Sequence, residues 1–218
     1  MIKLTENKKI FILGDSYSTY EGYVPEGYDI YYGPNSKYDA RVSDVNLTWW
    51  GRYLKNTNST LVRNCSWSGS TICHTGYDGA DKIGNSFITR MEKLINEGFF
   101  KENKVDTFFV FGGTNDSWAN APLGEKMYSG WEVKDLYSVL PAICYLLNLL
   151  KENLPETRII CLLNSGIYKK EITDTFIEAC QKYDIEYIEI KDFDMLTGHP
   201  TELGMEQIEK MVRDGMGR

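Results

Sequence analysis

The fold is indicated first by the stretch KIFILGDS, residues 9–16. Four apolar residues, 10–13, precede a glycine, which is typical of a short strand buried on both faces of a sheet. Gly14, Asp15 and Ser16 belong to the residue types that favour turns. The stretch therefore predicts a buried strand whose end carries polar side chains.

Apolar runs of the same kind recur at residues 61–66, 107–111, 158–164 and 185–190. Helical spacing of apolar residues separates them, in segments 45–55, 87–95, 136–150, 171–183 and 201–212. Strands that alternate with helices predict parallel β-α-β units with helices on both faces of the sheet. Pro141 predicts that the helix around it is kinked or restarted. The chain contains no repeat and no linker, so we expect one domain over residues 1–218.

Composition excludes several classes of protein. The hydrophobic share of 42% and the charged share of 25% over 218 residues are ordinary for a globular protein. With 24 basic and 31 acidic residues and no basic cluster, a nucleic-acid partner is not expected. The longest uncharged stretch, residues 136–150, is shorter than the roughly 20 residues of a membrane helix. No membrane association is therefore expected.

Cysteine usage and the first residues bear on location. The five cysteines form no CxxC pair, and those in apolar segments are expected to be buried free thiols. This pattern favours a reducing compartment. Residues 1–9 lack the apolar centre of a signal peptide. A cytoplasmic location is the default expectation, and an exported form with a trimmed signal stays open.

Four polar blocks lie where chemistry is expected, at residues 14–18, 64–70, 112–116 and 198–200. Loops after parallel strands meet at one edge of the sheet, where ligands bind. Ser16 follows a Gly-Asp turn that presents its hydroxyl, and Asn115 carries an amide that can donate to a developing negative charge. Gly69 allows a backbone N–H to approach a carbonyl oxygen closely. His199, one of two histidines, is expected in a loop just before the last helix. Each block taken alone is equally compatible with an ordinary turn or a structural residue.

Together, in this order and over nearly the whole chain, the four blocks resemble the SGNH (GDSL-type) hydrolase superfamily of esterases, lipases and carbohydrate deacetylases. The resemblance implies a three-layer α/β/α sandwich with a flavodoxin-like parallel sheet of about five strands. It implies that Ser16 is the nucleophile and His199 the general base. Gly69 and Asn115 would complete an oxyanion hole with the backbone N–H of Ser16. The expected substrate is an ester of a small molecule or a carbohydrate, with an O-acetyl group as one candidate, and no metal or cofactor is required.

Two positions depart from the family pattern. Tyr17 stands where the GDSL motif has leucine, away from the reacting atoms. Leu196 lies three residues before His199, where the family usually has aspartate. Asp194 or Asp192 is the alternative third member of a triad. Otherwise a backbone carbonyl orients the imidazole and leaves a Ser–His dyad.

Aromatic residues near the blocks are candidate substrate contacts, namely Tyr17, Trp67 and Trp118. Seven tyrosines between residues 17 and 38 either line a binding site or pack that segment onto the body of the protein. The leading alternative to an esterase is a carbohydrate-binding protein that keeps the fold without turnover. A nucleotide-binding domain is disfavoured, because neither GxGxxG nor GxxxxGK[ST] follows any predicted strand. The oligomeric state stays open.

Overall fold

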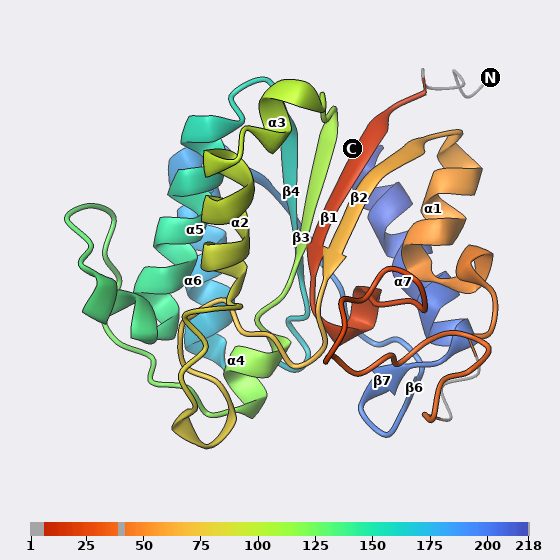
Figure 1. Cartoon of the computed structure of the whole chain (residues 1–218), viewed down its shortest axis with the longest axis horizontal. Helices are drawn as coiled ribbons and strands as arrows, with labels where there is room; N and C mark the ends of the chain where they lie inside the picture. Colours follow the sequence, from red (N-terminus) through yellow and green to blue (C-terminus); the bar gives the residue numbers. More distant parts are fainter. Residues whose placement is uncertain (1–6, 39–41, 218) are drawn as a thin grey trace.

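The computed structural model describes residues 7–38 and 42–217. Its centre is a parallel sheet with the strand order β2-β1-β3-β4-β5 (Figure 1). The strands are β1 (Lys9–Gly14), β2 (Thr60–Ser66), β3 (Thr107–Phe111), β4 (Arg158–Leu163) and β5 (Glu186–Glu189). β1 pairs with β2 on one side and with β3 on the other. The loops after these three strands therefore lie next to one another at the carboxyl edge.

Helices cover both faces of the sheet (Figure 1). One face carries α1 (Trp49–Thr57) and α7 (Glu202–Met216), and the other carries α2 (Phe87–Asn96), α3 (Phe99–Glu102), α5 (Val139–Asn153) and α6 (Lys170–Tyr183). In β1, Ile10 and Ile12 pack with the first group, and Phe11 and Leu13 pack with the second. Both sets are apolar, which explains the uninterrupted run in the sequence. The expected α/β/α sandwich is confirmed.

Two of the expected helices begin later than predicted, each after a short 3₁₀ turn. The segment around Pro141 divides into η4 (Val133–Tyr137) and α5, so the helix restarts rather than kinks. Pro141 lies in the first turn of α5, where a missing N–H costs no intrahelical bond. The segment 45–55 divides into η2 (Val45–Leu47) and α1. Thr48 caps α1 by accepting a hydrogen bond from the Gly51 N–H.

The segment before α7 is a small hairpin, and the expectation of a loop there was wrong. β6 (Met195–Leu196) pairs antiparallel with β7 (His199–Pro200), and Gly198 takes a positive φ of 81° in the turn between them. Thr201 caps α7 with its hydroxyl, which accepts a hydrogen bond from the Gly204 N–H. Pro200 is therefore part of the hairpin and not of the helix. His199 has a fixed strand backbone instead of a loop.

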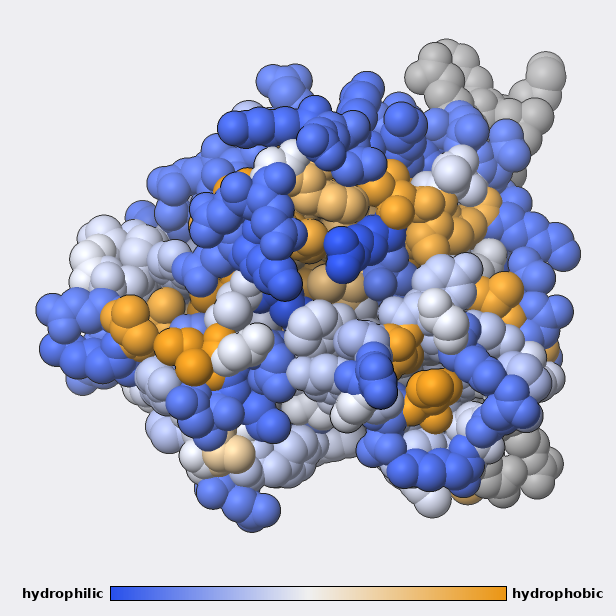
Figure 2. Space-filling view, in the orientation of Figure 1, coloured by the Kyte–Doolittle hydropathy of each residue, from blue (hydrophilic) through white to orange (hydrophobic). Residues whose placement is uncertain are grey.

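The remaining short elements are η1 (Ser16–Ser18), η3 (Tyr77–Gly79) and α4 (Thr114–Trp118). All five cysteines are buried free thiols. Within residues 7–38 and 42–217, no helix combines the length and apolarity needed to cross a membrane. The face in Figure 2 is mostly hydrophilic, with its hydrophobic residues in separate patches.

Candidate active site

Ser16 lies at the carboxyl end of the central strand β1. Asp15 caps the 3₁₀ turn η1 by accepting a hydrogen bond from the Tyr17 N–H at 3.1 Å. Gly14 is required at the end of the strand, because a Cβ there would lie 2.5 Å from the Ser66 Oγ. Ser16 is only 3% exposed. Its hydroxyl is therefore held in one place at the middle of the sheet edge.

His199 faces Ser16 from the β6–β7 hairpin. Its Nε2 lies 3.0 Å from the Ser16 Oγ, although 183 residues separate the two in the sequence. The Nδ1 of His199 lies 3.4 Å from the carbonyl oxygen of Thr197. A carbonyl only accepts, so Nδ1 carries the proton and Nε2 of the neutral ring accepts from the serine. Burial lowers the pKa of His199, which favours this neutral form.

Among the described residues, the group that faces the His199 Nδ1 is the backbone carbonyl of Thr197 and not a carboxylate. The hydroxyl of Thr201, at the N-terminus of α7, donates a hydrogen bond to the carboxylate of Asp194. No described contact joins the His199 imidazole to Asp194 or to Asp192, and both carboxylates are exposed. The expectation that Asp194 orients the histidine is therefore corrected. Of the alternatives left open by the sequence, the geometry matches the carbonyl of Thr197.

Ser16, Gly69 and Asn115, the residues expected to supply an oxyanion hole, line one pocket. Among the described residues, none accepts a hydrogen bond from the backbone N–H of Ser16 or of Gly69. Gly69 has a positive φ of 68°, which glycine adopts without strain. The Nδ2 of Asn115 donates to the carbonyl oxygen of Ser70 at 3.1 Å, and its second hydrogen is unused in the described contacts. The arrangement can hold an oxyanion.

Two buried charged residues fix the loops that carry these groups. The Asp116 carboxylate accepts hydrogen bonds from the N–H of Ile72, at 2.9 Å, and of Cys73, at 3.1 Å. The Arg90 guanidinium donates to the carbonyl oxygen of Cys65 and, at 3.0 Å, to the Ser70 Oγ. Sequence reasoning missed both roles. For Arg90, one signal was available in the sequence: the arginine lies within the apolar face of the 87–95 helix. A charge buried there needs hydrogen-bond partners.

Asp15 is a further buried acid beside Ser16. Burial raises the pKa of Asp15 to about 7, and the buried Asp116 carboxylate contributes to the rise. One of its oxygens has no hydrogen-bond partner among the described residues. Burial also raises the pKa of Asp116. The carboxyl edge of the sheet around Ser16 therefore disfavours a further negative charge unless N–H groups donate hydrogen bonds to that charge.

The groups around Ser16 line a pocket of about 160 Å³. Its lining residues are Ser16, Asp29, Tyr31, Ser68, Gly69, Tyr77, Asn115, Trp118 and His199. Of the three aromatic residues expected at the substrate, Trp118 lines the pocket and is 40% exposed. Tyr17 is fully buried, with its hydroxyl bonded to the carbonyl oxygen of Gly198 at 2.7 Å. Trp67 packs over the Arg90 guanidinium, outside this lining. The expectation of a substrate contact is therefore corrected for the buried Tyr17, and for Trp67 it stays a prediction.

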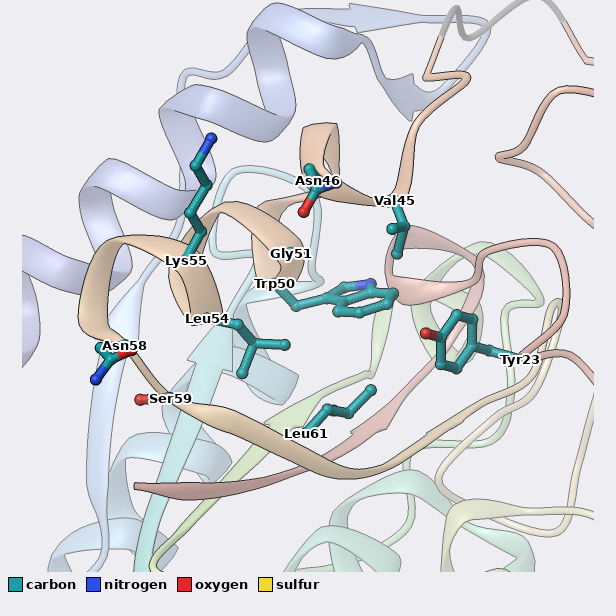
Figure 3. A pocket seen from close by; sticks show the side chains of 10 residues that line it. All are labelled: Tyr23, Val45, Asn46, Trp50, Gly51, Leu54, Lys55, Asn58, Ser59 and Leu61. Atoms are coloured by element: carbon teal, nitrogen blue, oxygen red, sulfur yellow. The ribbon is translucent and has the colours of Figure 1, made fainter. Parts of the chain in front are cut away.

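A second and more open pocket of about 410 Å³ lies beside α1 (Figure 3). Trp50, Leu54 and Leu61 supply apolar walls, and Tyr23 closes one end. Its lining contains no histidine or carboxylate beside a serine hydroxyl. Size alone would favour this pocket, but the chemistry favours the smaller one. In the described part of the chain, no three His, Cys, Asp or Glu side chains lie close enough to hold a metal ion.

A model of the GDSL-like lipase/acylhydrolase family matches residues 8–216. The chain belongs to this family. Membership makes this GDSL-like protein a hydrolase of ester bonds. A serine nucleophile and an oxyanion hole are typical of the family. No protein with a curated description matches the chain significantly.

Two solved structures resemble this GDSL-like hydrolase over its whole length. One is assigned as a GDSL-like lipase from Bacteroides ovatus, with 43% identity, a TM-score of 0.89 and coverage of 98% of this chain and 99% of its own. The other is assigned as a GDSL-like lipase from Bacteroides uniformis, with 44% identity, a TM-score of 0.88 and coverage of 100% and 99%. A family two carbohydrate esterase from Clostridium thermocellum is 16% identical over 97% of this chain and 64% of its own, with a TM-score of 0.64. That likeness shows a shared fold.

Proposed function

We propose that this hydrolase removes a short acyl group, such as acetyl, from a hydroxyl of a carbohydrate through a Ser16–His199 dyad. The observation that carries the proposal is the 3.0 Å contact between the Ser16 Oγ and the His199 Nε2 at the floor of a pocket. A nucleophile beside a base whose other nitrogen is already bonded is the arrangement required for acyl transfer.

The mechanism follows from the positions of the hydrogen-bonding groups. His199 removes the Ser16 proton while the Oγ attacks the ester carbonyl carbon. The carbonyl oxygen becomes negative and accepts hydrogen bonds from the N–H groups of Ser16 and Gly69 and from the Asn115 amide. His199 then gives its proton to the leaving alkoxide. In the second half, His199 takes a proton from water, which attacks the acyl-serine carbonyl carbon. The bond to the Ser16 Oγ breaks, the acid leaves, and His199 returns the proton to the Oγ.

The size and lining of the pocket support a small acyl group and a polar alcohol. About 160 Å³ accommodates an acetyl group but not a long hydrocarbon chain. Tyr77 and Trp118 offer aromatic faces to a sugar ring, and Asp29 and Ser68 offer polar atoms to its hydroxyls. The carbohydrate esterase with a similar fold agrees with this choice of substrate, although at 16% identity its likeness is one of fold.

The first experiment compares p-nitrophenyl acetate and p-nitrophenyl butyrate hydrolysis by the wild type and Ser16→Ala. We expect Ser16→Ala to lower kcat/KM by roughly 10³-fold or more, and the wild type to prefer acetate. Ser165→Ala is the matched control, because Ser165 follows β4 at the same edge but bonds Glu189. An unchanged rate in Ser16→Ala would refute the nucleophile assignment. Hydrolysis of acetylated and butyrylated sugars then tests whether a carbohydrate serves as the alcohol part of the ester.

A fluorophosphonate probe separates the esterase from the binding-protein alternative. The observation that favours the alternative is that, within residues 7–38 and 42–217, the His199 Nδ1 contacts the Thr197 carbonyl and no carboxylate. An activated serine reacts covalently with the probe, and a serine without an effective base does not. We expect labelling of the wild type and none of Ser16→Ala. An unlabelled wild type that binds acetylated sugars would support the alternative.

A further inference from the structure

Tyrosines hold the two residues that flank His199. The Tyr17 hydroxyl donates to the carbonyl oxygen of Gly198 at 2.7 Å, and the Tyr32 hydroxyl donates to that of Pro200 at 3.1 Å. Both tyrosine side chains are fully buried. Their hydroxyls therefore fix the hairpin backbone on both sides of the histidine.

Tyr31, between these two in the sequence, contacts the imidazole itself. The ring centroids of Tyr31 and His199 lie 3.8 Å apart, and the ring planes are inclined by only 16°. The ring of Tyr38 stacks on Tyr31 at 4.1 Å and 8°. The histidine thus forms one end of a stack of three rings. Rotation of the imidazole about its χ2 angle would break this contact.

The stack also places the imidazole of His199 over an electron-rich ring face. The face of a phenol ring is electron-rich and attracts a cation within about 6 Å of its centroid. His199 becomes an imidazolium when it takes the Ser16 proton, so its positive charge forms over the Tyr31 face. In a complete triad, an aspartate stabilises that imidazolium.

In the part of the chain that the structure describes, the groups that face His199 leave this task to the aromatic ring. From η1 it meets Ser16 and the Tyr17 ring, and from α4 the Trp118 ring. In the pocket, the Asp29 carboxylate pairs with Lys37 at 2.7 Å. On the hairpin side, Asp194 accepts from Thr201. Asp15 lies behind Ser16, where it accepts from the Tyr17 N–H.

We propose that Tyr31 is a positioning residue that orients His199 and stabilises its imidazolium, in place of the acidic third member of a triad. The proposal rests on the proposed dyad mechanism. A competing explanation is that Tyr31 only covers the histidine and excludes water. The two explanations differ in one respect: cover needs any apolar side chain, whereas stabilisation of the cation needs an aromatic face.

Substitution of Tyr31 by phenylalanine or leucine separates these explanations. Tyr31→Phe keeps the aromatic face, and Tyr31→Leu keeps apolar cover without it. We expect Tyr31→Phe to retain kcat within about twofold and Tyr31→Leu to lower kcat by about 3- to 10-fold, the size of a cation–π contact. Tyr31 is half-buried, and Tyr31→Met repeats the test with a slimmer side chain if Tyr31→Leu is poorly folded by circular dichroism.

NMR titration of the histidine ring protons supplies a readout that does not depend on turnover. The chain has two histidines, and His199→Gln identifies the signal of each. Loss of the aromatic face destabilises the imidazolium, so the pKa of His199 should fall by about half a unit to one unit in Tyr31→Leu and stay unchanged in Tyr31→Phe. Equal pKa values and equal rates in both variants would overturn the proposal. If the wild type hydrolyses no ester, the proposed function fails, but the titration still decides whether Tyr31 stabilises the imidazolium.

Discussion

The Tyr77 hydroxyl donates a hydrogen bond to the Oδ1 of Asn115 at 2.8 Å. This bond fixes which side of the amide is oxygen and which is nitrogen, because only the oxygen accepts. With the oxygen held by Tyr77 and one Nδ2 hydrogen held by the carbonyl of Ser70, the second hydrogen has a defined direction. The oxyanion hole therefore depends on a residue outside the four sequence blocks.

Tyr77→Phe should lower kcat by about 2- to 10-fold, the effect of one hydrogen bond, and should change KM little. The reason is that the Asn115 amide is then held only by its Nδ2 bond to the Ser70 carbonyl, so its second hydrogen is directed less firmly at the oxyanion. Asn115→Ala, which removes the donor, should cost about 10²–10³-fold. Steady-state kinetics on p-nitrophenyl acetate measure both. A Tyr77→Phe enzyme with the wild-type kcat would contradict this role.

Asp194→Asn should change kcat/KM by no more than about threefold, because Thr201 and not His199 bonds this carboxylate. Asp192→Asn, which retains a residue tolerant of the positive φ of 56° at that position, is the matched control. The same ester assay compares the two variants. A loss of about 10³-fold or more in Asp194→Asn alone would restore this residue as the third member of a triad.

The acidic limb of the pH–rate profile should have its midpoint below 6.5. Burial lowers the pKa of His199 from that ordinary value, and the base works only when it is neutral. Activity should therefore rise with pH to a plateau reached earlier than an exposed histidine would allow. The measurement is kcat/KM between pH 4.5 and 8, with Ser16→Ala subtracted as background. A midpoint at or above 6.5 would argue against a buried, uncharged environment.

Asp15→Asn should become more stable relative to the wild type as the pH rises. The folded pKa of Asp15, about 7, lies above the ordinary 3.8, so the neutral acid is favoured by folding. The contribution of neutral Asp15 to the stability of the folded state is complete below about pH 4 and is lost as the pH rises through 7. Between pH 5 and 8 the difference in unfolding free energy should shift toward the variant by roughly 3 kcal/mol. Urea denaturation at several pH values measures it, and a difference independent of pH would refute the assignment.

The sequence by itself determined the sheet and the four blocks. Residues 10–13 are all apolar, which is typical of a strand covered on both faces, and all four are buried in β1. Because parallel strands share a carboxyl edge, the order of the strands and helices was enough to bring Ser16, Gly69 and Asn115 to one place. The position of His199 near them also followed from its block.

Tertiary structure alone decided how His199 is held. The carbonyl of Thr197 and the ring face of Tyr31 contact the imidazole. The hydroxyl of Tyr17 bonds the neighbouring residue, Gly198. The Thr197 contact is local and is set by the turn of the β6–β7 hairpin. The two tyrosine contacts depend instead on how η1 and the segment after it pack against that hairpin. The same holds for Arg90, whose partners include the backbone carbonyl of Cys65, a group that any residue supplies. Local sequence specifies which groups reach the edge of the sheet, whereas long-range packing sets their orientation.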